Sequence, residues 1–134
     1  MSEYNIKKIN CQEKNILLLF FLNCKFENQK SFGGIDMKTF ILMTKLSPEE
    51  SKKMKERAKI GRGWLERVKE KCPQVRFVAH YAVLGPFDFL DIYEAPDEET
   101  AAKVSLISRD YGAFDAQSLM AIPYKDFLKL VEEI

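Results

Sequence analysis

Residues 75–94 hold two runs of strand-forming residues joined by a tight turn. The first run is Val75-Arg-Phe-Val-Ala-His-Tyr-Ala-Val-Leu84, the turn is Gly85-Pro86, and the second run is Phe87-Asp-Phe-Leu-Asp-Ile-Tyr-Glu94. Both runs are rich in β-branched and aromatic residues, and a Gly-Pro pair between two such runs marks a turn. Because a short connection joins antiparallel neighbours, we predict a β-hairpin over these residues.

The segment before the hairpin predicts a strand and one long helix. Residues 37–46 are strand formers and stop at Ser47-Pro48-Glu49-Glu50, where Ser47 is the expected N-cap and Glu50 completes a capping box. Small or apolar residues then recur every three or four positions until Pro73: Met54, Ala58, Gly61, Leu65, Val68 and Cys72. Gly61 and Gly63 would each destabilise a free helix by roughly 1 kcal/mol, so we expect close packing on the sheet or a bend there.

The segment after the hairpin repeats this order. A helix with an acidic first turn opens at Ala95-Pro96-Asp97 and ends at Gly112, with Ala101, Val104, Ser108 and Tyr111 on one face. A strand over 113–122 and a short terminal helix over 124–134 complete the chain. Two strand–helix–strand halves with a hairpin between them predict an α+β, ferredoxin-like βαββαβ fold, with two helices on one face of a four-stranded antiparallel sheet.

The sheet face turned away from the helices is expected to be apolar as well. In the strand over 87–94, Phe87, Phe89 and Tyr93 point to one side and Leu90 and Ile92 to the other. A solvated face would alternate polar residues outward. We therefore predict a homodimer in which two copies bury their open sheet faces against each other as a dimeric α/β-barrel.

Composition excludes several classes of function. The chain has 134 residues, 46% hydrophobic and 31% charged, which is typical of one soluble domain. Its net charge of +1 provides no field to attract nucleic acid or a membrane surface. Three Cys without a CxxC pair predict a reducing, cytoplasmic environment, and one His leaves no expected metal site.

Residues 1–36 differ in composition from the rest. All Asn residues of the chain lie within 1–36, whereas all Ala and Arg residues lie after residue 36. Its apolar run, 16–22, is much shorter than the ~20 residues that span a bilayer, and its flanks are poor for a signal peptide. Gly33-Gly34 could be encoded by a bacterial ribosome-binding sequence two codons before Met37. We therefore interpret 1–36 as an extension outside the fold, with Met37 as the biological start and 37–134 as the domain.

The hairpin and the helix and strand after it resemble the GYD-domain proteins. The resemblance covers most of residues 37–122, and its motif positions in this chain are Gly85, Phe87, Asp88, Glu94, Ala95, Pro96, Asp97 and Gly112. Phe87 stands where the family name has Tyr. The resemblance implies a dimeric α/β-barrel, a group that includes binding and regulatory modules, cofactor-free monooxygenases, haem-degrading enzymes and isomerases, so it implies the fold far more than the chemistry.

Two residues are candidates for acid–base chemistry. His80 is the only imidazole and, by strict alternation, shares a face with Arg76, turned away from the helices. It is a candidate base or haem ligand, or else a hydrogen-bonded interface residue. Asp88, just after the turn, is a second candidate, or else a carboxylate that accepts backbone N–H bonds.

Four residues are candidates for binding a small aromatic molecule: His80, Tyr81, Trp64 and Arg76. Aromatic residues in a small domain more often belong to the core. Three functions stay open. The leading one is a non-catalytic homodimeric module that binds a small apolar molecule without a cofactor. The others are an enzyme of the dimeric α/β-barrel group and a structural subunit that binds a protein partner.

Overall fold

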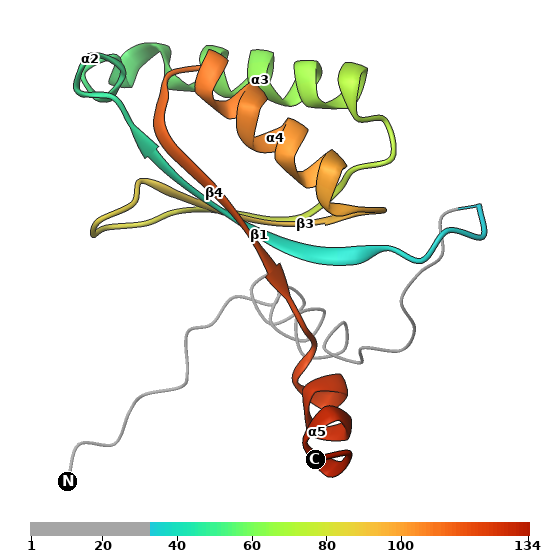
Figure 1. Ribbon diagram of the computed structural model, residues 1–134. Coiled ribbons are helices and arrows are strands. Elements are labelled where there is room, and N and C mark those ends of the chain that lie inside the picture. The colour runs from blue at the N-terminus through green and yellow to red at the C-terminus, as the bar shows by residue number, and fades with distance from the viewer. Residues whose placement is uncertain (1–32) are drawn as a thin grey trace, which may run out of the picture.

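The computed structural model describes residues 33–134 as one antiparallel sheet with its two long helices on one side (Figure 1). The sheet order is β2-β3-β1-β4. The strands and main helices are β1 (Lys38–Leu46), α3 (Arg57–Lys71), β2 (Arg76–Ala82), β3 (Phe89–Ala95), α4 (Glu98–Asp110), β4 (Ala113–Ala121) and α5 (Tyr124–Glu132). This order and pairing confirm the predicted ferredoxin-like α+β fold.

The core lies between the sheet and the two helices α3 and α4. Leu42, Val68, Tyr93 and Val104 are fully buried there. The predicted inner face of α4 is confirmed, since Ala101, Val104 and Ser108 are all buried. Burial of a large apolar side chain stabilises a fold by about 1.5–3 kcal/mol, so this layer holds the helices on the sheet.

Helix α4 begins and ends as its sequence predicts. The Asp97 carboxylate accepts a hydrogen bond from the Thr100 N–H at 2.7 Å, as an N-cap should. Gly112 follows the C-cap residue Tyr111 and has a φ of +93°, a left-handed conformation that favours glycine. Its carbonyl accepts a hydrogen bond from the Ser47 N–H at 3.0 Å, which ties the end of α4 to the end of β1.

The predicted single long helix after β1 is wrong, because the structure divides it. A short helix α2 (Pro48–Ser51) and a 3-10 turn η1 (Met54–Glu56) precede α3. The Ser47 hydroxyl does cap Glu50 N–H at 3.2 Å, but the Ser47 N–H bonds to Gly112 and not to Glu50. The Glu50 carboxylate instead pairs with Lys53 and Arg57 across the break. Met54, placed on the apolar stripe by its spacing, is 79% exposed.

Strand β2 contains a bulge that changes which side chains face the helices. Phe77 pairs with Tyr93 and Ala79 pairs with Ile92, so Val78 is an extra residue in the ladder. Beyond the bulge His80 lies opposite Asp91, on the helix side of the sheet, while Arg76 lies opposite Glu94 on the other side. The expectation that His80 and Arg76 share the open face is therefore wrong, since one inserted residue reverses the alternation.

No described element covers the other face of the sheet (Figure 1). Cross-strand neighbours Ile41 and Ile92 lie at its centre, and Leu119 pairs with Ile41 on the outer side. Helix α5 projects away from the end of β4 and buries none of its residues. Within residues 33–134 no helix is both long and apolar enough to cross a membrane. The proposed extension 1–36, apart from its last four residues, lies outside the described residues.

Candidate functional site

A cavity of about 590 Å³ separates the first half of α3 from the sheet. This volume is in the range of small-molecule sites. Ala58, Gly61 and Leu65 of the α3 stripe line the cavity, whereas Val68 and Cys72, farther along the same stripe, are buried in the core. The apolar face of α3 thus packs on the sheet at its C-terminal end and stands off from it at its N-terminal end.

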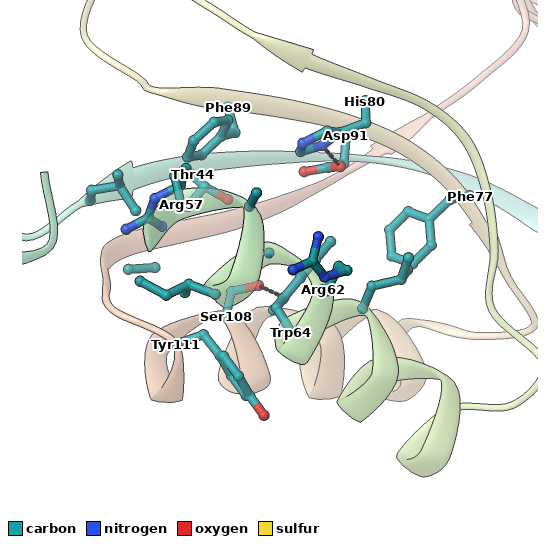
Figure 2. Close-up of a pocket in the computed structure, with 16 residues that line it drawn as sticks. Thr44, Arg57, Arg62, Trp64, Phe77, His80, Phe89, Asp91, Ser108 and Tyr111 are labelled. Atoms are coloured by element: carbon teal, nitrogen blue, oxygen red, sulfur yellow. Dashed lines mark hydrogen bonds and ion pairs between the residues drawn. The ribbon is translucent and has the colours of Figure 1, made fainter. Parts of the chain in front are cut away.

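Aromatic side chains from three elements form the walls of this cavity (Figure 2). Trp64 comes from α3, Phe77 from β2 and Phe89 from β3. The Trp64 and Phe77 rings lie 5.2 Å apart between centroids. The Trp64 indole N–H donates to the Ser108 hydroxyl at 2.9 Å, which fixes the ring against α4. Trp64 is therefore both a packing residue and a cavity wall.

His80 and Asp91 form the polar part of the cavity. The His80 Nδ1 atom is hydrogen-bonded to the Asp91 carboxylate, whose side chain is only 3% exposed. The imidazole lies between Phe89, 5.7 Å away, and Trp64, 6.4 Å away, with both rings stacked on it. Its side chain is still 60% exposed. Because Nδ1 faces Asp91, the ring nitrogen that remains for a ligand is Nε2.

The hydrogen bond to Asp91 raises the pKa of His80 above its ordinary value of 6.5, against the opposing effect of burial. A raised pKa means that the charged imidazolium is stabilised in the folded state. That stability is fully present below the unfolded pKa, near 6.5, and is lost as the pH rises through the folded pKa.

A tag-free NMR titration tests this pair directly, because His80 is the only imidazole in the chain. We expect its midpoint above 6.5 in the native protein and a lower midpoint in Asp91→Asn, where burial acts without the carboxylate. The melting temperature of the native protein should also fall more between pH 6 and pH 8 than that of the variant. An unchanged midpoint in Asp91→Asn would show that the carboxylate does not hold the charge.

Two arginines reach the cavity from α3. The Arg57 guanidinium contacts the Glu50 carboxylate at 3.4 Å and the Glu50 carbonyl oxygen at 3.1 Å, so Arg57 is held by Glu50, whose carboxylate also pairs with Lys53. Figure 2 shows the Arg62 side chain extending from α3 toward the sheet beside Trp64. Within the part of the chain that the structure describes, Arg62 makes no ion pair.

The two glycines of α3 have different surroundings. A Cβ atom at Gly63 would lie 3.2 Å from the Tyr111 ring, so Gly63 permits close packing against the end of α4 and not on the sheet, where it was predicted. A Cβ atom at Gly61 would meet nothing within 4 Å, and Gly61 has no positive φ. Gly61 is therefore not needed for close packing, and its missing side chain leaves room in the cavity.

The structure brings together two of the residues predicted to bind a ligand. His80 and Trp64 both line the cavity. Tyr81 pairs with Leu90 on the open face and is 42% exposed, and Arg76 forms an ion pair with Glu94 on that same face. Neither Tyr81 nor Arg76 is among the described cavity residues.

His80 and Asp88, the two acid–base candidates, are not brought together in the cavity. The Asp88 carboxylate accepts a hydrogen bond from the Leu46 N–H at 2.7 Å, and its backbone closes the β2–β3 turn through Val83. This is the structural use of Asp that the sequence left open beside the catalytic one. In the described chain, no group of three or more His, Cys, Asp or Glu side chains is placed to hold a metal ion.

The hairpin motif matches a known family. The family model for the GYD domain covers residues 40–131. This chain belongs to the GYD-domain family. The motif residues of the GYD domain support the fold: Asp88 joins β3 to β1, Asp97 caps α4 and Gly112 ends it. None of the eight motif positions is among the described residues that line the cavity.

One curated relative is the "Glutamine synthetase and cystathionine beta-lyase binding protein" of Thermus thermophilus. It is 34% identical over 98 residues, which span 69% of this chain and 96% of the relative. Among solved structures, the crystal structure of MtbAldR covers 82% of this chain and 68% of its own, with a TM-score of 0.49 and 16% identity. That second likeness is too distant to support a conclusion about fold or function.

Proposed function

We propose that this GYD domain is a non-catalytic, homodimeric module that binds a small apolar molecule in the cavity between α3 and the sheet. The observation that carries the proposal is the cavity itself, about 590 Å³ with Trp64, Phe77 and Phe89 as walls. The open space at Gly61 supports it, because a helix that only packed there would gain roughly 1 kcal/mol from Ala.

The hydrogen bonds of Ser108 and His80 argue against a serine-type nucleophilic mechanism in the cavity. Ser108 donates to the Val104 carbonyl at 2.9 Å and accepts from Trp64, so its hydroxyl is fully used in packing α3 on α4. His80 bonds to Asp91, and within the described residues no hydroxyl is hydrogen-bonded to its ring. A serine-type nucleophilic mechanism needs the hydroxyl next to its base. The proposal assigns no cofactor to the site.

A fluorescent apolar probe tests the binding site. The neutral dye N-phenyl-1-naphthylamine should brighten on the full chain and saturate at one dye per chain. Gly61→Phe should reduce its affinity at least about tenfold, because a ring at this position occupies the open space. Gly61→Ala is the matched control, which leaves most of the space free and should bind as the native protein does. Equal binding by all three proteins would overturn the assignment of the site.

The second copy is proposed to cover the open sheet face. This face is four strands wide, with two strands of nine residues and two of seven, which gives about 500 Å² at the usual strand spacing and rise. Two such faces together bury about 1,000 Å², somewhat below the usual range of about 1,200–2,000 Å² for stable interfaces. The centre is apolar and the rim carries both charges, Arg76 and Lys45 with Glu94 and Asp115, so two copies can pair without net repulsion.

Helix α5 is proposed to extend this interface. Its apolar residues are exposed, and they continue an exposed apolar band from the end of β4: Leu119, Ile122, Tyr124, Phe127, Leu128, Leu130 and Val131. A nine-residue helix without a packing surface is unstable in water. The area that α5 adds would raise the dimer above the minimum for a stable interface.

Binding of a protein partner is the second candidate function, and the name of the Thermus thermophilus relative favours it. The test is to mix the full chain with the glutamine synthetase and the cystathionine β-lyase of its own host and to measure co-elution by size-exclusion chromatography. Co-elution that persists in Gly61→Phe would assign partner binding to a surface away from the cavity. Separate elution of both enzymes would remove this candidate.

A further inference from the structure

The charges around the cavity do not balance. From β2 and β3, His80 and Asp91 face the cavity as a pair. From α3, Arg57 and the exposed Arg62 reach it, and Arg57 shares the Glu50 carboxylate with Lys53. At the end of α4 the only titratable lining group is Tyr111, and the lining residues from β1 and β4 carry no charge. Arg62 is therefore a cation with no counter-ion among the described cavity residues.

The second polar feature is the free nitrogen of His80. Asp91 holds Nδ1 and the rings of Phe89 and Trp64 stack on the imidazole, so the orientation of the ring is set by three neighbours. A carboxylate bonded to one ring nitrogen stabilises the imidazolium, in which Nε2 also carries a proton and donates. Nε2 of protonated His80 and the Arg62 guanidinium are thus two N–H donors on residues that line an otherwise mostly apolar cavity.

We propose that the molecule bound in this cavity is an aromatic carboxylic acid, with its ring against Trp64, Phe77 and Phe89 and its carboxylate accepting hydrogen bonds from His80 Nε2 and Arg62. The proposal rests on the proposed function, since it names the chemical class that the same cavity takes. A flat apolar body suits the stacked walls, and an anionic head supplies the missing negative charge. Hydrogen bonds to charged groups are stronger than those between neutral groups, so the carboxylate decides which aromatic molecules the cavity prefers.

Matched ligands test this in the full chain. Quenching of Trp64, the only tryptophan, reports binding of 2-naphthoate and of its neutral counterpart 2-naphthamide at pH 6. We expect naphthoate to bind about tenfold more tightly or better, as two charged hydrogen bonds imply. The preference should shrink as the pH rises and His80 loses its proton, because of the two proposed donors only Arg62 then remains charged.

Two variants each remove one of the proposed donors, and a third variant is the control. Arg62→Gln should reduce the preference for naphthoate several-fold and leave naphthamide binding unchanged. His80→Asn keeps an N–H near the Nδ1 position for Asp91 but has no Nε2, so it should remove the pH dependence of the preference. Arg67→Gln is the control on the same helix, because Arg67 pairs with Glu70 outside the cavity and its loss should change neither ligand.

Different binding results would contradict the carboxylate head and the cavity as a binding site. Equal affinity for naphthoate and naphthamide, with neutral dye binding still blocked by Gly61→Phe, would overturn the carboxylate head and leave the cavity as a binding site. Loss of the preference in Arg67→Gln would also overturn it, since the charge would then act from the surface. Absence of dye binding in the native protein would overturn the proposed function itself.

Discussion

The substitution Ile92→Lys is expected to convert the protein from a dimer into a monomer. Ile92 lies on β3, next to Ile41 of β1, at the centre of the apolar sheet face that no described element covers. In a face-to-face dimer this position meets the other copy, and the twofold axis places two Lys side chains in one apolar interface. Buried unpaired charges are unfavourable by several kcal/mol each, which is more than a minimal interface can offset.

Size-exclusion chromatography with light scattering measures this result. The native chain should elute at twice the 15.6 kDa mass of one chain, and Ile92→Lys at 15.6 kDa. Leu106→Lys is the matched control, because Leu106 is 61% exposed on α4, away from the sheet face, and its substitution should leave the dimer intact. A native chain that is monomeric at micromolar concentration would contradict the proposed role of the open face.

The second large effect is expected at Gly112, where Gly112→Ala should destabilise the fold. The φ of +93° is unfavourable for any residue with a Cβ atom, by about 1–2 kcal/mol. The new atom would also overlap Glu50 Cγ and lie 3.0 Å from Glu50 Cβ. Glu50 cannot move freely, because its carboxylate pairs with Lys53 and Arg57 and its N–H bonds to Ser47. The substitution therefore breaks contacts as well as straining the backbone.

Thermal unfolding of Gly112→Ala and Gly61→Ala provides an internal comparison. Gly112→Ala should lower the melting temperature. Each kcal/mol of lost unfolding free energy corresponds to a decrease of about 4–8 °C in a domain of this size. Gly61→Ala should raise it, since Ala favours the helix by about 0.5–1 kcal/mol and the space at Gly61 is open. Two decreases of similar size would mean that Gly61 has a structural role that its surroundings do not show.

The order and pairing of the elements were predictable from local signals. The Gly85-Pro86 turn between two strand-forming runs, the Asp97 N-cap and the Gly112 C-cap each act within a few residues of the chain. Such signals are present in the sequence without knowledge of the tertiary fold. The alternation in β1 and β3 was predictable for the same reason, and it separates buried Leu42 and Tyr93 from the open face.

The candidate site was only partly predictable, because it depends on one extra residue. Strict alternation placed His80 beside Arg76, but the bulge at Val78 turns His80 toward α3 and Asp91. The consecutive apolar residues Val78 and Ala79 interrupt the alternating pattern, and this interruption was the signal that could have indicated a bulge. Asp91 was overlooked because a carboxylate inside an apolar strand reads as a surface residue until its partner is known.

The helix break and the cavity were not predictable from spacing. The stripe from Met54 to Cys72 has helical periodicity throughout, but ion pairs of Glu50 with Lys53 and Arg57 stabilise a turn at its beginning. Periodicity shows which face of a helix is apolar, not whether that face touches the sheet or stands off from it. The stand-off at Ala58, Gly61 and Leu65 is a property of packing between distant segments, which is why the cavity appears only in the structure.

Each copy of a homodimer is proposed to hold a small molecule between α3 and the sheet. A native mass spectrum of the full chain is the most direct test of this proposal, when it is recorded from a cell lysate without denaturation. We expect a dimer that carries one non-covalent molecule per chain, and the same dimer without that mass for Gly61→Phe. An equal retained mass on both proteins, or an empty native monomer, would contradict this expectation.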